Sequence, residues 1–575
     1  TGAVLEAAGI SVDEVLIEGW RARVLRARAQ LGWTAPGVVA RRHARGVSFA
    51  LAAPCDRLMA ATEVNEWALC AALVAHDPDR WSGLGAALAA DALEDTADPQ
   101  VFDAPVLDET AALARFGRLA HRQARPDLTA LLAAAATREL PHVLDDDTLT
   151  LGAGARGRDF SLAALPRVAG APWNELGDIP TALVTGSNGK TTTVRLLAAC
   201  ARAHGWPAAY CCTDGVFLDR ELLAAGDYAG PAGARRVMRE RGAEAAIVET
   251  ARGGILRRGL ALSHAHVAVV TNVSPDHFGE YGIDDLEALA DAKLTVAGVV
   301  IPGGLLVLNA DDARLVAKAP QLAGRFGRSP PLGWFALDDA ALLREHRARG
   351  GSTCGARHGL LILSHAGAGH DLGAIAAMPL TIEGSAHYNI ANLAGSALAA
   401  VALGIAPATI AAVFARFGQS AADNVGRMMR FDVGGVRVLV DYAHNPQGLR
   451  GLLEVALHLK GGTGRLGVLL GHAGNRQDSE LEALAHVAAE FHPDLIVVKE
   501  NEAHLRGREP GEVPRLIRAA LLHAGLPESA LPVRMSELEA ARCALEWARP
   551  GDVLALPVHS AAARTAVLAL LSARR

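Results

Sequence analysis

The stretch from Thr181 to Cys200 constrains the fold of this chain more than any other. It reads TALVTGSNGKTTTVRLLAAC: a short apolar run rich in β-branched residues, a turn with Gly186 and Gly189, and a helical pattern that opens at Lys190. A buried strand followed by a glycine turn and a helix is the local structure of a phosphate-binding loop in a parallel α/β sheet. The sequence therefore predicts an α/β fold around this segment.

The residues of the turn suit an anionic phosphate. Backbone N–H groups at a helix N-terminus point at phosphate oxygens, a lysine can reach the β- and γ-phosphates, and a threonine hydroxyl can join a Mg²⁺ shell. Gly186 lies only three residues before Gly189, which is closer than the usual motif, so a chance strand, turn and helix is the alternative. The strand context and the run of threonines favour a nucleotide phosphate site. The residues assigned to it are Gly186, Asn188, Gly189, Lys190, Thr191 and Thr192.

Two further residues are placed to hold a metal beside that loop. Glu249 closes the apolar run EAAIVE, and His277 follows the run HAHVAVVTN. Strand ends in a parallel sheet meet at the ligand crevice, and Mg²⁺ prefers oxygen ligands. Alone, either side chain would be a cap, an ion-pair partner or a satisfied histidine. Lys293, in the helical stretch after His277, would on its own be a solvated surface lysine.

The order of the elements predicts three units. Residues 176–424 alternate apolar runs with helical stretches and predict a central, doubly wound domain. Residues 425–575 repeat this alternation and predict a C-terminal Rossmann-like domain. Residues 1–175 predict a separate N-terminal α/β domain and linker of unassigned role; it includes a helix over Thr62–Val74 and a Gly- and Pro-rich connection at Leu149–Pro180.

Composition excludes several classes of function. The net charge is −6, from 56 basic and 62 acidic side chains, so no nucleic-acid partner is expected. The apolar runs noted, such as Leu128–Ala136, are shorter than the ~20 residues of a membrane span, and no secretory leader precedes them, so we expect a cytoplasmic protein that does not enter a membrane. The 7 cysteines lack C-x-x-C spacing and are expected to be reduced.

A series of ordered motifs resembles the Mur ligase superfamily, which includes folylpolyglutamate synthetases. The resemblance runs from about Asp178 to Gly551 and is closer to the Mur-like part of cyanophycin synthetases. The motifs are TGSNGKTTT, TDG at 213–215, GDYAGP at 226–231, ETARGGILRRGL at 249–260, TNVSPDHFG at 271–279, LNADD at 308–312, HYNIANLAGSALAA at 387–400, GRM at 426–428, DYAHNPQGL at 441–449 and KENEAHLRGREPGEV at 499–513.

The resemblance implies roles for matching residues. ATP would be held by the turn residues with Asn309, Asn389, Asn392, Arg427, Asp441 and His444. One or two Mg²⁺ ions would be held by Thr191, Glu249 and His277, and by Lys293 if that lysine is carbamylated. The catalytic set it implies is Lys190, Glu249, His277, Lys293 and Arg427.

Charged residues in the later motifs are candidates for substrate recognition. Guanidinium groups bind carboxylates in bidentate fashion. Arg252, Arg257 and Arg258 could therefore bind a substrate carboxylate, although a surface ion pair is the ordinary alternative. A second cluster, Glu500, Glu502, Arg506 and Arg508, could recognise the incoming amino acid, although a solvated loop is the alternative. The residues assigned to substrate are Thr213, Arg252, Arg257, Arg258, Glu500, Arg506 and Arg508, with Glu502 beside them.

The resemblance implies an ATP-dependent ligase that activates a carboxylate as an acyl phosphate and joins it to the amine of an amino acid or peptide. The residues before the central domain show no ATP-grasp loop, so a complete cyanophycin synthetase is not expected. A polymer-forming or dipeptide-joining ligase of that type stays an alternative, as do a nucleotide hydrolase or kinase and a non-catalytic ATP-binding subunit. A homo-oligomer is compatible with the sequence.

Overall fold

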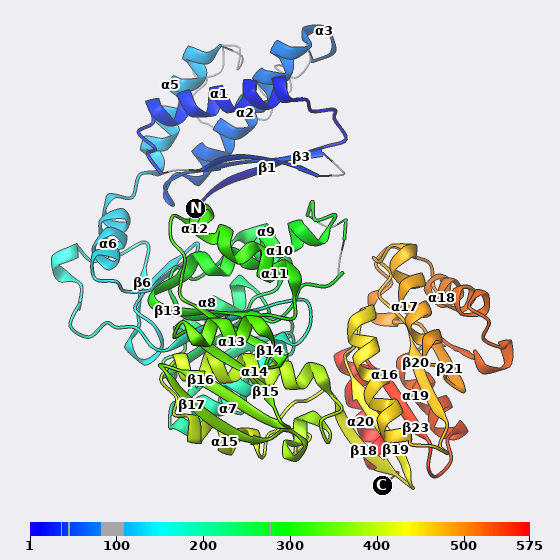
Figure 1. The fold of residues 1–575 in the computed structure, drawn as a ribbon. Helices are drawn as coiled ribbons and strands as arrows, with labels where there is room; N and C mark the ends of the chain where they lie inside the picture. The colour runs from blue at the N-terminus through cyan, green and yellow to red at the C-terminus, as the bar shows by residue number, and fades with distance from the viewer. Residues whose placement is uncertain (36, 44–45, 82–107, 276–277, 280, 575) are drawn as a thin grey trace.

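The N-terminal part of the chain is a small antiparallel sheet covered by helices on one face (Figure 1). The computed structural model describes residues 1–35, 37–43, 46–81, 108–275, 278–279 and 281–574. Trp20 and Phe49 are fully buried where the helices meet the sheet, with Trp67 and Phe116 beside them. The elements are β1 (Gly2–Ala8), α1 (Glu14–Gln30), β2 (Val38–His43), β3 (Gly46–Ala52), α2 (Leu58–His76), α3 (Pro78–Trp81) and α5 (Glu109–Gln123), with sheet order β1-β3-β2.

The helix expected over Thr62–Val74 is longer than predicted. It begins at Leu58 and ends at His76, and the Thr62 hydroxyl donates to the Leu58 carbonyl one turn earlier in the same helix. Among the described helices, α2 alone is long and apolar enough to cross a membrane by length and composition, with a mean hydropathy of 1.3. Its residues from Ala60 to Leu73 contribute to the core between α1, α5 and the sheet, and core packing accounts for that hydropathy.

A small sheet connects this part to the central one. Arg239, the last residue of α8 (Pro231–Arg239), pairs with Asp145, and its Nε donates to Thr150 Oγ1 at 2.8 Å. The segment expected to be a plain connection at 149–180 thus includes strands of a packed sheet. The elements are α6 (Pro126–Thr137), β4 (His142–Leu144), β5 (Thr148–Leu151) and β6 (Arg158–Ser161).

The central part is a large sheet whose middle strands are parallel. The strand order is β10-β9-β8-β11-β7-β12-β13-β14-β15-β16-β17, antiparallel at both ends. The strands are β7 (Thr181–Thr185), β8 (Ala208–Cys212), β9 (Gly215–Leu218), β10 (Glu221–Ala225), β11 (Ala245–Glu249), β12 (Ala265–Val270), β13 (Val300–Asn309), β14 (Leu332–Asp338), β15 (Ser352–Arg357), β16 (Leu360–His365) and β17 (Ala368–Ala374).

Helices cover both faces of this sheet, which confirms the doubly wound α/β prediction. Ala182 and Val184 face the core under α7, α14 and α15, whereas Leu183 between them faces the core under α8 and α10. Successive strand residues point to opposite faces, so an apolar run without alternation marks a strand buried on both sides. The helices are α7 (Lys190–His204), α8 (Pro231–Arg239), α9 (Arg252–Arg258), α10 (Leu286–Leu294), α11 (Ala313–Lys318), α12 (Leu322–Phe326), α13 (Ala341–Ala348), α14 (His387–Ala402) and α15 (Pro407–Phe414).

The C-terminal part is a second, smaller sheet with helices on both faces. Its order is β18-β19-β23-β20-β21-β22, and among the described strands of this sheet only β18 and β19 pair in the antiparallel sense. The elements are β18 (Met429–Val433), β19 (Val436–Asp441), α16 (Pro446–Lys460), β20 (Leu466–Leu470), α17 (Asp478–Glu490), β21 (Leu495–Lys499), α18 (Glu512–His523), β22 (Val533–Arg534), α19 (Glu537–Trp547), β23 (Val553–Pro557) and α20 (Ala561–Ser572).

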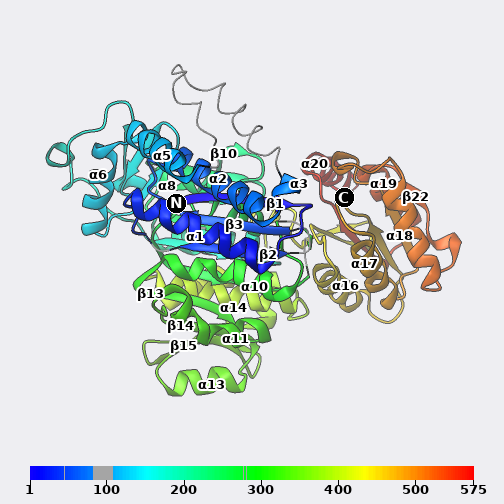
Figure 2. The same ribbon diagram turned by 90° about the horizontal axis from the view of Figure 1, so that it is seen from above.

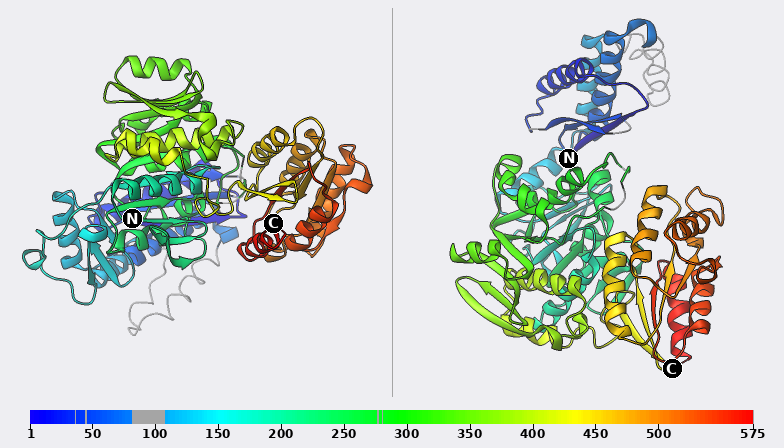
Figure 3. Two further views of the ribbon diagram at one scale, coloured as in Figure 1. Left: turned by 90° about the horizontal axis from the view of Figure 1, so that it is seen from below. Right: turned by 45° about the vertical axis from the view of Figure 1, so that its right-hand side comes forward.

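The N-terminal and C-terminal parts lie against different sides of the central one (Figures 2 and 3). The N-terminal sheet also touches the central part directly, because Arg41 of β2 donates to the Tyr281 carbonyl at 2.6 Å. The N-terminal part therefore contacts the central part both through the small connecting sheet and through its own sheet.

Replacing Asn65 with alanine tests whether α2 is a core helix. The Asn65 side chain accepts from Trp20 Nε1 and donates to the Phe49 carbonyl, both at 2.9 Å, and it is 1% exposed. Loss of both partners should destabilise the N-terminal part by about 3 kcal/mol, because buried polar groups would be left unpaired. Amide hydrogen exchange in α1 and α2 should accelerate accordingly. Thr62→Ala on the exposed side of α2 is the control, and equal exchange in the two variants would contradict this account.

Candidate functional site

The turn after β7 can be built only from glycine at two positions. Gly186 has a φ of +146° and Gly189 a φ of +86°. A Cβ atom at Gly186 would lie 1.8 Å from Thr271 Oγ1, and one at Gly189 would lie 2.2 Å from Asn392 Oδ1. The glycines thus satisfy both the backbone conformation and the close approach of neighbouring side chains.

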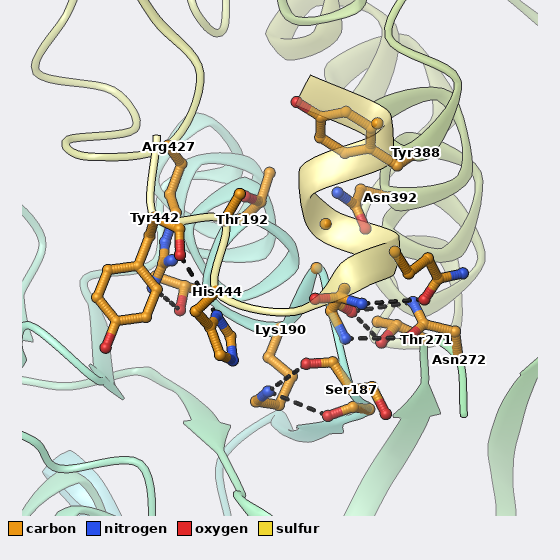
Figure 4. Close-up of a pocket in the computed structure, with 18 of the residues that line it drawn as sticks. Ser187, Lys190, Thr192, Thr271, Asn272, Tyr388, Asn392, Arg427, Tyr442 and His444 are labelled. Atoms are coloured by element: carbon orange, nitrogen blue, oxygen red, sulfur yellow. Dashed lines mark hydrogen bonds between the residues drawn. The ribbon is translucent and has the colours of Figure 1, made fainter. Parts of the chain in front are cut away.

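Lys190 lies over the turn that precedes its own helix. Its Nζ donates to the carbonyl oxygens of Gly186 and Ser187, both at 3.0 Å (Figure 4). The ammonium group and the N-terminus of α7 therefore place positive charge at the same end of the helix. An anionic phosphate is the ligand that this arrangement suits.

Glu249, at the end of β11, is fully buried and only half satisfied. Its Oε2 accepts from Thr191 Oγ1 at 2.8 Å, whereas Oε1 is buried without a hydrogen-bond partner. Burial raises the pKa of Glu249, against the opposing effects of Lys190 and Thr191. A hard cation would satisfy the orphaned oxygen, so this carboxylate and the neighbouring hydroxyl fit a Mg²⁺ ion.

Of the two other residues predicted to bind metal, Lys293 and His277, only Lys293 lies in the described part of the chain. Lys293 lines the same cleft and is 2% exposed, so it is not the solvated surface lysine that its helical context alone would indicate. His277 lies outside the described residues. In the described part of the chain, no three histidine, cysteine or acidic side chains gather into a ready-made metal cluster.

Arg427 brings the C-terminal part of the chain to the phosphate loop. Its Nη2 donates to Thr191 Oγ1 at 3.3 Å and to Thr213 Oγ1 at 3.1 Å. The guanidinium lies 4.2 Å from the centre of the Tyr442 ring (Figure 4). The Arg427 guanidinium, which comes from the C-terminal part, is thereby fixed beside the turn that the sequence predicts to bind phosphate.

Amide side chains make a second link across the same junction. Asn188 Nδ2 donates to Gln447 Oε1, and Asn445 Nδ2 donates to Asn188 Oδ1, each at 2.9 Å. Both partners of Asn188 follow β19, in the segment that carries Asp441 and His444. The phosphate loop and the C-terminal sheet are therefore in direct contact.

The asparagines expected near the nucleotide are held by their own neighbours. Asn309 donates to the Thr271 carbonyl at 3.0 Å, Asn392 donates to Asn389 Oδ1 at 3.1 Å, and Asn389 donates to the Leu380 carbonyl at 3.0 Å. These bonds fix the shape of the cleft wall opposite the C-terminal sheet.

Asp441 and His444 lie on that opposite wall. Both carboxylate oxygens of Asp441 accept backbone N–H groups, from Met428 at 2.6 Å and from Ala443 at 2.8 Å. Burial raises the pKa of Asp441, while Arg427 and the backbone bonds act in the opposite direction. The carboxylate therefore ties together two backbone segments of this wall, and one of them includes the residue next to Arg427.

Behind this wall, a buried ion pair fixes the end of β23. Lys499 and Glu537 are both fully buried and paired, and Glu537 also accepts the backbone N–H of His559 at 2.9 Å. Burial opposes ionisation of Glu537, yet Lys499 and His559 outweigh it and lower the pKa of Glu537 to about 2. His559 Nε2 contacts the Ala443 carbonyl at 2.9 Å. The network supports the segment that carries Asp441.

Together these residues line a cleft of about 920 Å³ between the central and C-terminal sheets. The sequence-predicted residues at its wall are Gly186, Asn188, Gly189, Lys190, Thr191, Thr192, Thr213, Glu249, Arg252, Lys293, Asn309, Asn389, Asn392, Arg427, Asp441, His444 and Arg506. Residues of both sheets are therefore brought to one site from positions more than 200 apart in sequence.

Several predicted substrate residues are not brought to the cleft. Arg257 and Arg258 are exposed on α9. Glu500 accepts the Gly511 N–H at 2.7 Å before α18, and Glu502 accepts the Glu537 N–H at 3.3 Å. Arg508 pairs with Asp478 at 2.6 Å and with Glu512 at 2.8 Å. Arg508 lies before the first residue of α18, so its pair with Glu512 fixes the loop against the start of that helix.

The sequence interpretation missed other residues of the cleft wall. His472 and His559 follow β20 and β23, so the rule that selected Glu249 at a strand end would also have selected them. Burial, with Arg476 and His559 nearby, lowers the pKa of His472 well below its ordinary value. The missed residues that line the cleft include Asp227, Tyr281, Tyr388, His472, Arg476 and His559.

Two protein-family models match the central and C-terminal parts of the chain. The Mur ligase middle domain family matches residues 184–333, and the Mur ligase glutamate ligase domain family matches residues 426–556. A cyanophycin synthetase of Trichormus variabilis is 36% identical over 402 residues, which are 68% of this chain and 43% of that protein. The chain thus spans less than half of the length of that relative.

A second relative is matched over most of its length. The UDP-N-acetylmuramoyl-L-alanyl-D-glutamate--2,6-diaminopimelate ligase of Chlorobaculum tepidum is 30% identical over 390 residues, which cover 64% of this chain and 70% of that protein. Among solved structures, E. coli FolC in complex with DHPP and ADP is 19% identical with a TM-score of 0.49, over 69% of this chain and 89% of that one. This chain belongs to the Mur ligase family.

Proposed function

We propose that the protein is an ATP-dependent amide ligase that joins a carboxylate to the amine of an amino acid or peptide, with release of ADP and phosphate. The observation that carries the proposal is the meeting of Lys190, Glu249 and Arg427 around Thr191. The phosphate loop supplies one set of charges and the C-terminal sheet supplies another. Phosphoryl transfer depends chiefly on positioning and on charge stabilisation of this kind.

The reaction has two balanced steps. A carboxylate oxygen of the first substrate attacks the γ-phosphorus, the bond to the ADP oxygen breaks, and an acyl phosphate forms. The amine nitrogen of the second substrate then attacks the acyl carbon, and phosphate leaves with the carboxylate oxygen that it had bonded. The amine proton is released to solvent.

Residues of this chain have separate roles in those steps. Lys190 and the N-terminus of α7 bind phosphate oxygens, and Arg427 contributes charge from the other wall. Mg²⁺, when bound, neutralises phosphate charge. Thr191, Glu249 and His277 would hold it, joined by Lys293 if that lysine is carbamylated. Asn188 joins the phosphate-binding turn to the segment after β19. Closure of the two cleft walls at this junction would exclude water, which would otherwise hydrolyse the acyl phosphate.

The amine substrate is assigned to the C-terminal end of the cleft. Arg476 and Arg506 line that end together with His472 and His504. Two guanidinium groups suit the carboxylate of an amino acid or peptide. Arg252, beside Tyr281, is assigned to the carboxylate donor at the other end.

The direct test is ADP and phosphate release by the purified protein with MgATP and pairwise pools of amino acids and short peptides. Release should require two partners and should accompany a product whose mass equals their sum minus water. Lys190→Ala should abolish release by removing the phosphate-binding cation. ATP binding without turnover in any pair would instead favour a non-catalytic subunit, and turnover without a second partner would favour a hydrolase.

Replacing Glu249 with glutamine should separate stability from activity. Burial raises the pKa of Glu249, so the folded protein keeps the carboxyl proton to a higher pH than the unfolded chain does. The free energy of unfolding therefore falls as the pH rises from the pKa of the unfolded state to that of the folded state. At pH 8, Glu249→Gln should therefore keep or raise the unfolding temperature without ligands, yet lose the stabilisation given by MgATP. Glu244→Gln, exposed beside the same strand, is the control. Unchanged MgATP stabilisation in Glu249→Gln would contradict the metal assignment.

Arg506 and Arg508 offer a matched pair for the amine subsite. Arg506 lines the cleft, whereas Arg508 is held by Asp478 and Glu512 outside it. Arg506→Ala should raise the KM for the amine substrate about tenfold or more without changing the KM for ATP, because a charge-assisted contact to carboxylate is lost. Arg508→Ala should lower the unfolding temperature and leave the amine KM nearly unchanged. The reverse pattern would overturn this assignment.

A further inference from the structure

Asp214 joins the central and C-terminal sheets through two arginines. One carboxylate oxygen accepts from Arg195 of α7 at 2.7 Å, and the other accepts from Arg564 of α20 at 2.5 Å. The three side chains are between 8% and 14% exposed, and Asp214 and Arg564 lie 350 positions apart in sequence. The carboxylate is therefore a shared, nearly buried partner of cations from two units.

The same arginines hold the segment that precedes Arg427. Arg195 Nη1 donates to Asn424 Oδ1 at 3.2 Å and to the Val425 carbonyl at 2.8 Å. Gly426 has a φ of +71° and packs so closely on Arg564 that a Cβ atom would lie 2.7 Å from its Cδ. The residues just before Arg427 are thus fixed by the two cations that Asp214 joins.

The remaining neighbours complete this support. Asn424 Nδ2 donates to Thr192 Oγ1 at 3.3 Å, and Asp441 accepts the Met428 N–H at 2.6 Å. Arg427 itself donates to Thr213, the residue adjacent to Asp214. Asp214 therefore lies at the centre of the contacts that determine where the Arg427 guanidinium points.

We propose that Asp214 is a positioning residue that locks α20 onto α7 and thereby holds Arg427 against the phosphate loop. The inference rests on the proposed function, in which Arg427 contributes charge to the nucleotide phosphates. Asp214 does not itself line the cleft, so it acts through Arg427.

Electrostatics explain why an ionised carboxylate is needed at this position. Arg195, Arg564 and Arg427 would repel one another in a poorly solvated junction without an anion between them. Burial opposes ionisation of Asp214, but Arg195, Arg427 and Arg564 outweigh it and lower the pKa of the carboxyl group. An asparagine keeps the shape of this side chain and removes the charge.

The test is a double-mutant cycle on MgATP affinity, measured by calorimetry on the full chain. Asp214→Asn should weaken MgATP binding about tenfold or more, since loss of one partner leaves buried cations uncompensated. In an Arg427→Met background the same change should have less than about a twofold effect, because the residue through which Asp214 acts is gone. Asp339→Asn is the matched control, because it breaks an arginine–aspartate pair, with Arg347, inside the central part.

Arg564→Gln removes the C-terminal partner of Asp214, and it replaces Asp214→Asn in the test if that variant does not fold. Unchanged affinity in Asp214→Asn or Arg564→Gln, or an equal loss in the Arg427→Met background, would overturn the proposal. Small-angle scattering without nucleotide gives a readout that does not depend on ligase activity. The radius of gyration should rise in both variants and not in Asp339→Asn. If the radius of gyration rises in this way but the wild-type protein makes no amide product, the proposed function is contradicted and the positioning role of Asp214 is still supported.

Discussion

One hydroxyl group connects the three elements on which the site depends. Thr191 Oγ1 donates to the buried carboxylate of Glu249 and accepts from Arg427, while Thr191 itself lies in the first turn of α7. A hydroxyl has one donor and can accept from others, so both bonds can form at once. The phosphate loop, the end of β11 and the start of the C-terminal sheet are therefore positioned relative to one another by a single side chain.

The doubly wound sheet makes this meeting possible. Parallel strands place their carboxyl ends along one edge, so β7 and β11 deliver the turn and Glu249 to the same crevice. The C-terminal sheet presents the ends of β19, β20 and β23 to that crevice from the opposite side. The N-terminal sheet reaches the cleft wall through Arg41 and the Tyr281 carbonyl. The central and C-terminal parts thus form the walls of the cleft, and the N-terminal part contacts one of those walls.

The local sequence was sufficient to predict the elements that depend only on the preferences of neighbouring residues. The apolar run Thr181–Thr185 followed by two glycines and a lysine predicted β7, the turn and α7, because strand, turn and helix preferences agree there. Long-range partners could not be predicted from those patterns. The contact of Asn188 with Gln447, and the capture of Glu500 and Arg508 by nearby backbone and acidic groups, depend on tertiary packing. The start of α2 at Leu58 was missed because its first turn has no side-chain cap.

Transfer of the γ-phosphoryl group to a substrate carboxylate inside this cleft is the step on which the proposed function depends. It is tested most directly by labelling both oxygens of the carboxylate donor with ¹⁸O and measuring the mass of the phosphate released during turnover with MgATP. Transfer through an acyl phosphate predicts one ¹⁸O atom in each phosphate, because the carboxylate oxygen leaves with it. Unlabelled phosphate, with ¹⁸O appearing only when the solvent water is labelled, would show hydrolysis of ATP and contradict the account.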